Sequence, residues 1–71
     1  MIYYKVVKQR LYSEELGKYV SYGIKIHTDN SRIVLYDVST NKRKLRRLVS
    51  LCNKNCVDPQ HLMDVIDDYM Y

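Results

Sequence analysis

The sequence predicts an α+β fold, in which a three-stranded antiparallel meander is followed by two amphipathic helices packed on one face of the sheet (order βββαα). Residues 2–38 contain three runs rich in β-branched residues and tyrosine, separated by two short polar turns. After Val38 the spacing of the apolar residues becomes that of a helix. With 71 residues, the chain is less than half of the ~150 residues used as a prior for one domain, so we expect a single domain over residues 1–71.

The three strands are predicted from the turns that separate them. The first turn holds Gly17, which can take a positive φ without steric cost. The second turn, residues 29–31, holds side chains that hydrogen-bond their own backbone. Between the turns, apolar residues alternate with polar ones from Val20 to Ile26. The predicted strands are residues 2–12, 19–28 and 32–38.

Two strand features carry further expectations. Gly23 is isolated within the second strand, and it indicates either a bulge or close backbone approach, or a local weakness of the strand. The third strand has a nearly continuous apolar run, which favours a strand that is covered on both faces. In that strand Ile33 and Leu35 are expected to face one way, and Val34, Tyr36 and Val38 the other.

The starts of both helices have specific signals. Ser39, Thr40 or Asn41 can cap the first helix, which we expect to end at the Asn-Lys-Asn run that follows Cys52. Asp58 followed by Pro59 indicates the second start, because proline suits the first helical position. One apolar stripe is Leu45, Leu48, Val49 and Cys52, and the other is Leu62, Val65, Ile66 and Tyr69.

Charge is distributed unevenly along the chain. The net charge is +4. Residues 42–54 carry six basic side chains and no acidic one, whereas residues 55–71 carry four acidic side chains and no basic one. This asymmetry is the most informative feature of the composition. Five of the basic residues form the candidate nucleic-acid-binding cluster: Lys42, Arg43, Lys44, Arg46 and Arg47.

The basic cluster has two interpretations. Its side chains can neutralise phosphates and release counterions, and tyrosines on the sheet could stack on single-stranded bases. Alternatively, the cluster is a solvated helix face that pairs with Asp64, Asp67 and Asp68 of the second helix. Basic residues at a helix N-terminus oppose the helix dipole, which suggests that these charges serve a purpose.

Other chemistry has little support in the sequence. Cys52, Cys56, His27 and His61 are the candidate metal ligands, but their spacing is loose and no second closely spaced pair exists. No glycine-rich turn presents a nucleophile or cradles a phosphate, because the chain has only two glycines. We therefore expect no enzyme activity, no catalytic residues, no metal, no cofactor and no small-molecule substrate.

Cysteine use and hydropathy indicate a cytoplasmic protein. The first residues lack the apolar core of a secretory signal, and no apolar run is long enough to cross a membrane. Cys52 and Cys56 are only four residues apart, which is a poor start for a disulfide, so we expect free thiols in a reducing compartment.

Four segments carry a resemblance to a known family. They are YGI (Tyr22–Ile24), DVS (Asp37–Ser39), LVSLCN (Leu48–Asn53) and PQHLMDVIDDYM (Pro59–Met70). From about residue 19 onward, the chain resembles a family of small clostridial-type bacterial proteins classed as a domain of unknown function. The resemblance implies helix caps, apolar stripes and a turn, and it implies no activity and no site residues. The four segments that carry the resemblance do not include the basic cluster.

The leading functional hypothesis is a small non-enzymatic interaction or regulatory protein that associates with itself. Two helices can cover only one face of a three-stranded sheet, so the apolar residues of the other face would need a partner. A homodimer is the simplest such partner, although another protein would also serve. The alternative is a nucleic-acid-binding protein that uses the basic cluster on its first helix.

Overall fold

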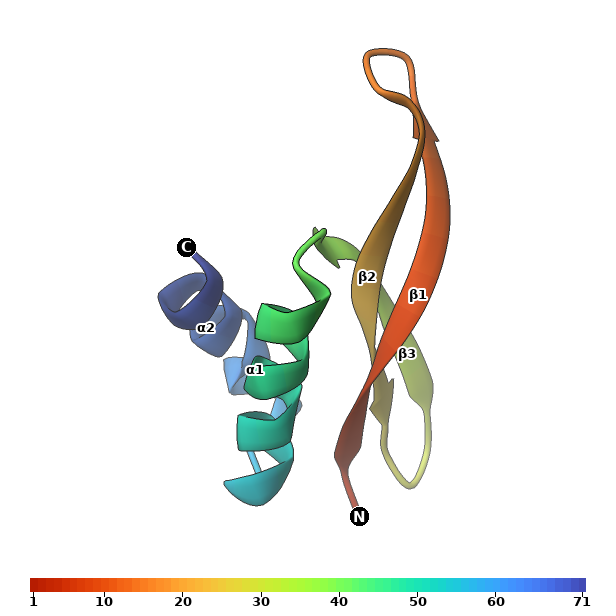
Figure 1. Ribbon diagram of the computed structural model, residues 1–71. Coiled ribbons are helices and arrows are strands. Elements are labelled where there is room, and N and C mark those ends of the chain that lie inside the picture. Colours follow the sequence, from red (N-terminus) through yellow and green to blue (C-terminus); the bar gives the residue numbers. More distant parts are fainter.

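The structure is a computed structural model that describes residues 1–71, and it has the predicted order of elements. The three strands form one antiparallel sheet in the order β1-β2-β3, and the two helices follow in the chain (Figure 1). The α+β prediction of a meander followed by two helices is therefore confirmed. The elements are β1 (Tyr3–Ser13), β2 (Gly17–His27), β3 (Arg32–Ser39), α1 (Lys42–Lys54) and α2 (Pro59–Met70).

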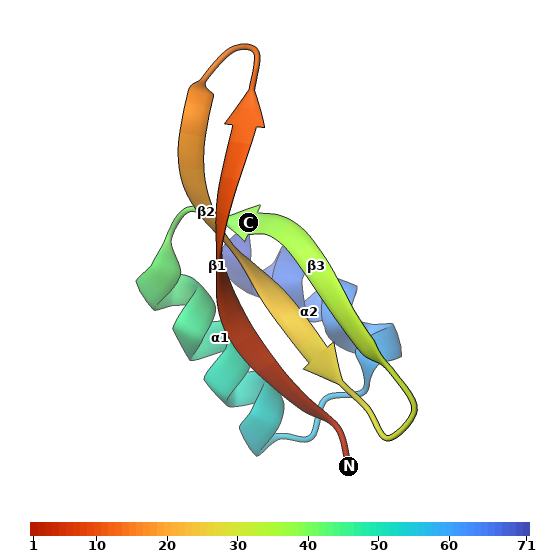
Figure 2. The same cartoon turned by 90° about the vertical axis from the view of Figure 1, so that its right-hand side faces the viewer.

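Both helices lie on the same face of the sheet (Figures 1 and 2). The core lies between this face and the two helices. On that face Tyr4 pairs with Ile26 across the β1–β2 ladder, and Val6 pairs with Ile24. The helices contribute the apolar stripes that the sequence predicts, and Cys52 is buried as a small apolar residue. The buried core consists of Tyr4, Ile24, Ile26, Leu45, Leu48, Val49, Cys52, Leu62 and Ile66.

The predicted helix starts are confirmed. Of the three residues that could cap α1, Asn41 does so, because its side-chain oxygen accepts a hydrogen bond of 3.1 Å from the backbone N–H of Lys44. Asp58 caps α2 by accepting a hydrogen bond of 3.0 Å from the backbone N–H of Gln60, and Pro59 takes the first helical position. The caps fix where each helix begins relative to the sheet.

The β1–β2 hairpin is longer than β3 and projects beyond the rest of the molecule (Figures 1 and 2). Pairing between β2 and β3 ends at Tyr22 and Ser39, whereas pairing between β1 and β2 continues to Ser13 and Gly17. Gly17 has a φ of 71°, which only glycine adopts easily at this turn. We call the projecting part, residues 10–20, the arm. None of its residues belongs to the core or packs against it.

A bulge in β3 lies at the base of the arm. Ile24 pairs with Leu35 but Tyr22 pairs with Ser39, so three residues of β3 lie opposite Gly23 alone. Asp37, in the middle of these three, has a φ of 54°. Gly23 is buried, and a Cβ atom there would overlap the carbonyl oxygen of Leu35. Gly23 therefore marks a bulge and a close backbone approach, which was one of its two predicted roles.

The expectation that β3 would be covered on both faces is wrong. β3 is an edge strand without a fully buried residue, and the exposed fractions of Ile33 and Tyr36 are 49% and 70%. Val38 does not face the same way as Tyr36, since both Leu35 and Val38 pack against the core. The bulge breaks the alternation between Leu35 and Val38.

The second face of the sheet is uncovered, as two helices on one face require (Figure 2). It is more polar than expected. The β1–β2 register pairs Lys5 with Lys25 and Tyr3 with His27 on this face, and His27 also pairs with Arg32 of β3. Because this face carries charges, it needs a partner less than an apolar face would.

Candidate nucleic-acid interface

The outer side of α1 gathers four of the five basic residues that form the predicted cluster. The helix buries its apolar stripe against the sheet, so the residues between the stripe positions point into solvent. All four are exposed, and together with Ser50 they line one shallow hollow of about 470 Å³. We call these four residues the basic face: Lys42, Arg43, Arg46 and Arg47.

Lys44 is separated from the basic face. It is only partly exposed, and its ammonium nitrogen lies 5.9 Å from the centre of the Tyr69 ring on α2. A cation above an aromatic ring is attracted by the ring's negative face. Lys44 therefore belongs to the contact between the two helices, and the predicted cluster of five is a surface of four.

A second hollow, of about 540 Å³, joins the basic face to the sheet. It lies between α1 and β1, where Lys42 and Arg46 meet Lys5 and Lys8. Tyr22 of β2 also lines it, and the Lys42 ammonium lies 5.8 Å from the centre of the Tyr22 ring. The basic surface is thus wider than one helix. Lys5, Lys8 and Tyr22 were not predicted from the sequence, although the hairpin register places Lys8 directly opposite Tyr22.

Asn53 lines this hollow and attaches α1 to the edge of β1. Its side-chain oxygen accepts a hydrogen bond of 2.8 Å from the backbone N–H of Tyr4, and its side-chain nitrogen donates one of 2.9 Å to the carbonyl of the same residue. Both edge groups of Tyr4 are therefore satisfied by one amide. The Tyr4 hydroxyl also donates to the carbonyl of Val57, which follows α1. These bonds set the spacing between α1 and β1.

The cations of the basic face have no acidic partner. The one salt bridge in the structure joins the N-terminal amine to Asp29 at 2.7 Å, and both groups are highly exposed. No ion pair links α1 to Asp64, Asp67 or Asp68 of α2. The alternative prediction, that the basic helix pairs with the acidic helix, is therefore wrong for direct ion pairs. The first turn of α1 also contains no acidic residue, so the positive end of the helix dipole adds to these charges.

The uncovered face of the sheet carries a second group of cations around one aromatic stack. The rings of Tyr3 and His27 are stacked, with their centres 4.3 Å apart and their planes 7° apart. Arg32 Nε donates a hydrogen bond of 3.3 Å to His27 Nδ1, which requires that nitrogen to be unprotonated. Desolvation, followed by the charges of Lys25, Arg32 and Lys5, lowers the pKa of His27 below its ordinary value. This face therefore repels a further positive charge.

The polar group at the base of the arm is structural in character. The Asp37 carboxylate accepts hydrogen bonds of 2.6 Å from Ser21 and 2.7 Å from Tyr19, and these bonds lower its pKa. The backbone N–H of Asp37 donates a hydrogen bond of 2.8 Å to the side-chain oxygen of Gln9, and this bond stabilises the backbone of the bulge. A carboxylate with a lowered pKa is a weak base near neutral pH. Ser21 is buried, so this hydroxyl is shielded from a substrate.

The cysteines and histidines do not converge. Cys52 is buried and Cys56 is exposed beyond the end of α1, and both thiols are free. Burial raises the pKa of the Cys52 thiol, which makes it less reactive. His61 is exposed in the first turn of α2. No group of three or more His, Cys, Asp or Glu side chains is placed to hold a metal ion.

Comparison with known proteins adds a family to this description. No helix here has both the length and the apolar character that a membrane crossing requires. No match was found among the curated proteins or among the solved structures. One family model, described as "Family of unknown function (DUF6514)", matches residues 1–71, so the match is longer than the resemblance noted from residue 19 onward. The chain therefore belongs to this family of unknown function.

Proposed function

We propose that this protein is a non-enzymatic binding module that holds nucleic acid on the basic face and the adjoining hollow. One observation carries the proposal: four exposed cations of α1 and Lys8 of β1 border connected hollows, and none of them forms an ion pair. Unpaired cations at this density attract a polyanion more strongly than a solvated, neutralised helix face does. Phosphates spaced along a backbone match such a surface.

The electrostatics give a quantitative expectation. If the basic face and Lys8 neutralise five phosphates, the logarithm of the binding constant falls with the logarithm of salt concentration with a slope of about −4.5 for duplex DNA. For a single strand the expected slope is about −3.5. The hollow also offers the Tyr22 ring and the polar groups of Ser50 and Asn53 beside the cations. These groups suit the sugar and base parts of a nucleotide.

The order of the two functional hypotheses changes with the geometry. The sequence favoured self-association first, because an uncovered apolar sheet face needs a partner. The uncovered face carries Lys5, Lys25 and Arg32 instead. The basic face is unpaired, and the hollow beside it extends the basic surface onto β1. The non-enzymatic part of the proposal rests on the sequence, which contains no catalytic motif.

Fluorescence anisotropy with labelled 20-mers, single-stranded and duplex, tests this function at 50 and 200 mM salt. The triple variant Arg43→Glu, Arg46→Glu, Arg47→Glu should abolish binding. A matched control, Lys18→Glu, Lys25→Glu, Arg32→Glu, changes the net charge equally on the arm and the uncovered sheet face, outside both hollows, and should retain most of the binding. An equal loss in both variants would show attraction by net charge alone and would refute the site. Absence of wild-type binding at 50 mM salt would refute the function.

Self-association is a second proposal, and the arm is the observation that favours it. The arm projects away from its own helices and exposes apolar side chains (Figure 1). Exposed apolar groups on a projecting element are typical of contacts with another chain. We also propose a bacterial, cytoplasmic protein, on the sequence resemblance and on the free thiols of Cys52 and Cys56. Analytical ultracentrifugation over a range of concentrations tests the self-association directly.

A further inference from the structure

The arm carries large apolar side chains that its own chain leaves in solvent. The exposed fractions are 71% for Tyr12, 71% for Leu16 and 42% for Val20. These residues lie on the part of the hairpin that β3 does not reach, so no helix or third strand covers them (Figure 1). A two-stranded ribbon without further support is marginally stable in water. The arm therefore gains most from a surface that covers it.

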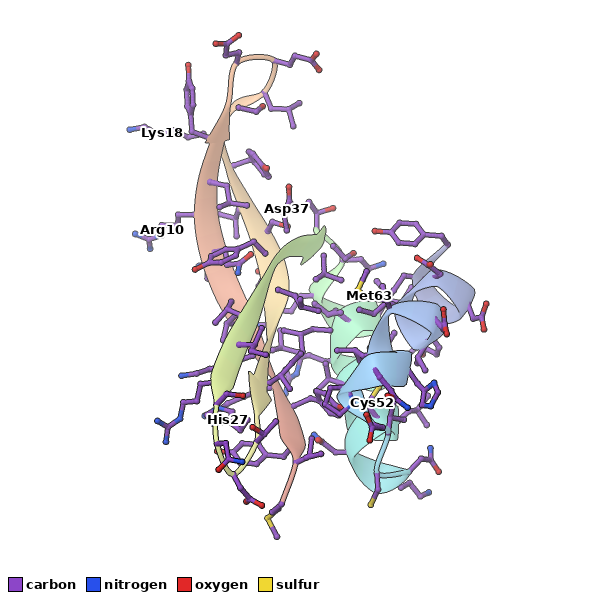
Figure 3. The ribbon with its side chains drawn as sticks, turned by 180° about the vertical axis from the view of Figure 1, so that it is seen from behind. Arg10, Lys18, His27, Asp37, Cys52 and Met63 are labelled. Carbon is purple, nitrogen blue, oxygen red and sulfur yellow. The ribbon has the colours of Figure 1, made fainter.

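One face of the arm is both apolar and basic. The β1–β2 register pairs Arg10 with Val20 and Tyr12 with Lys18, so these four side chains share one face. Arg10 and Lys18 project from the same side of the ribbon, away from the helices of their own chain (Figure 3). The acidic residues of this region, Glu14 and Glu15, lie in the turn and not on this face. The arm thus presents two cations beside two apolar residues.

The complementary surface is a groove between β3 and α2, which we call the α2 groove. Its volume is about 430 Å³, and seven of its eight lining residues are hydrophobic. The eighth is Asp67, and α2 carries Asp64 and Asp68 in addition but no lysine or arginine. The seven hydrophobic residues are Val34, Leu35, Tyr36, Val38, Met63, Ile66 and Tyr71. The Tyr71 hydroxyl donates a hydrogen bond of 2.9 Å to the carbonyl of Val38.

We infer that the arm of one chain docks in the α2 groove of a second copy, and that the second copy's arm docks in the groove of the first. This inference rests on the proposal of self-association and names its surfaces. The arm carries Arg10 and Lys18 beside its apolar residues, whereas the groove is apolar with one acid, Asp67, in its lining and further acids on the same helix. An arm cannot fold back into its own groove, because it projects away from the body (Figures 1 and 3).

The positions of the two surfaces allow a closed dimer. Ser39, where β3 ends, pairs with Tyr22 at the base of the arm, so the groove residues at the end of β3 lie next to the arm's origin. Two chains related by a two-fold axis can therefore exchange arms reciprocally, without open-ended polymers. A specific interface of standard size takes about 800 Å² from each partner, which is roughly 15% of this chain's surface of 5430 Å².

Charge reversal in two separate variants tests the exchange by analytical ultracentrifugation without nucleic acid. The arm variant is Arg10→Glu, Lys18→Glu, and the groove variant is Asp64→Lys, Asp67→Lys. We expect the wild type to dimerise and each variant alone to be a monomer, with a dissociation constant raised at least 100-fold. An equimolar mixture of the two variants should form a heterodimer, since each reversed arm then meets a reversed groove and each native arm a native groove. Circular dichroism shows whether each variant is folded, and Leu51→Ser on α1 serves as a control that remains dimeric.

The outcomes separate this inference from the proposal on which it rests. A wild type that stays monomeric at millimolar concentration overturns both self-association and the arm exchange. Dimers that persist in the arm and groove variants overturn only the exchange, because self-association then uses another surface such as the edge of β3. Folded monomeric variants whose mixture does not dimerise also overturn the exchange. Recovery of a dimer in the mixture supports it, since misfolding of either variant would not produce that recovery.

Discussion

Replacement of Asn53 by alanine tests the attachment of α1 to β1 on which the candidate interface depends. The Asn53 amide satisfies both the N–H and the carbonyl of Tyr4, a residue that is only 3% exposed. One hydrogen bond contributes about 0.5–1.5 kcal/mol, so the pair accounts for about 2 kcal/mol. A core of this size supplies roughly 3–5 kcal/mol in total. Asn53→Ala should therefore remove about half of the free energy of unfolding, measured by urea titration with circular dichroism.

Two further variants make the Asn53 prediction sharper. Asn55→Ala is a matched control, because the Asn55 side chain donates only one exposed hydrogen bond, to the carbonyl of Leu51. Asn53→Asp can still accept from the N–H of Tyr4, but its ionised second oxygen faces the Tyr4 carbonyl. Its pKa in the folded state should be raised above the unfolded value of about 3.9, so its stabilisation is full below that value and is lost as pH rises through the folded pKa. The reasoning would be refuted if Asn53→Ala were as stable as the wild type. It would also be refuted if the stability of Asn53→Asp had the same pH dependence as that of the wild type.

Three other substitutions have expected outcomes. Gly23→Ala should destabilise the fold by about 1–3 kcal/mol in urea unfolding, because the new Cβ overlaps the backbone carbonyl of Leu35; an unchanged stability would contradict the close approach at the bulge. In NMR experiments the pKa of His27 should lie below about 6.5, its ordinary value. The neutral ring therefore stabilises the fold above that pH, and this stabilisation should be lost as pH falls through the lowered pKa. His27→Gln should remove that part of the acid dependence, and a titration above 6.5 would argue against the influence of the neighbouring cations. Leu48→Ala removes a fully buried side chain and should cost about 2–5 kcal/mol, which leaves much of the protein unfolded at 25 °C; a native circular dichroism spectrum and melting curve would show that the core tolerates the cavity.

Local signals explain why the sequence predicted the elements well. The caps at Asn41 and Asp58 act on backbone groups two or three residues away, so they can be recognised without knowledge of the fold. Gly17 is similar, because the positive φ of its turn depends on that residue alone. Each apolar stripe also repeats within one helix. Boundaries set by such short-range interactions were predicted to within a few residues.

Long-range geometry explains what the sequence analysis missed. The bulge of β3 depends on Gln9 of β1, which binds the backbone of Asp37, so no local pattern indicated that Val38 would turn toward the core. The hollow beside α1 likewise combines residues from β1, β2 and α1 that are far apart in the sequence. Its one available signal was the hairpin register, which pairs Lys8 with Tyr22. That register indicates a shared face but not which helix would lie beside it.

The separation of charge along the chain is preserved in the folded molecule, and this preservation allows both proposed interactions to coexist. A positive helix followed by a negative one would be expected to neutralise itself, but α1 and α2 meet the core through their apolar stripes, and their charged side chains form no ion pair. The basic face and the α2 groove share no lining residue. Nucleic acid and a second copy of the chain therefore need not compete for one surface. It follows that charge reversal at Arg43, Arg46 and Arg47 should leave dimerisation intact. Charge reversal at Asp64 and Asp67 should leave the salt-dependent binding of nucleic acid intact. If either reversal abolished both interactions in a folded protein, nucleic-acid binding and dimerisation would not be independent of each other.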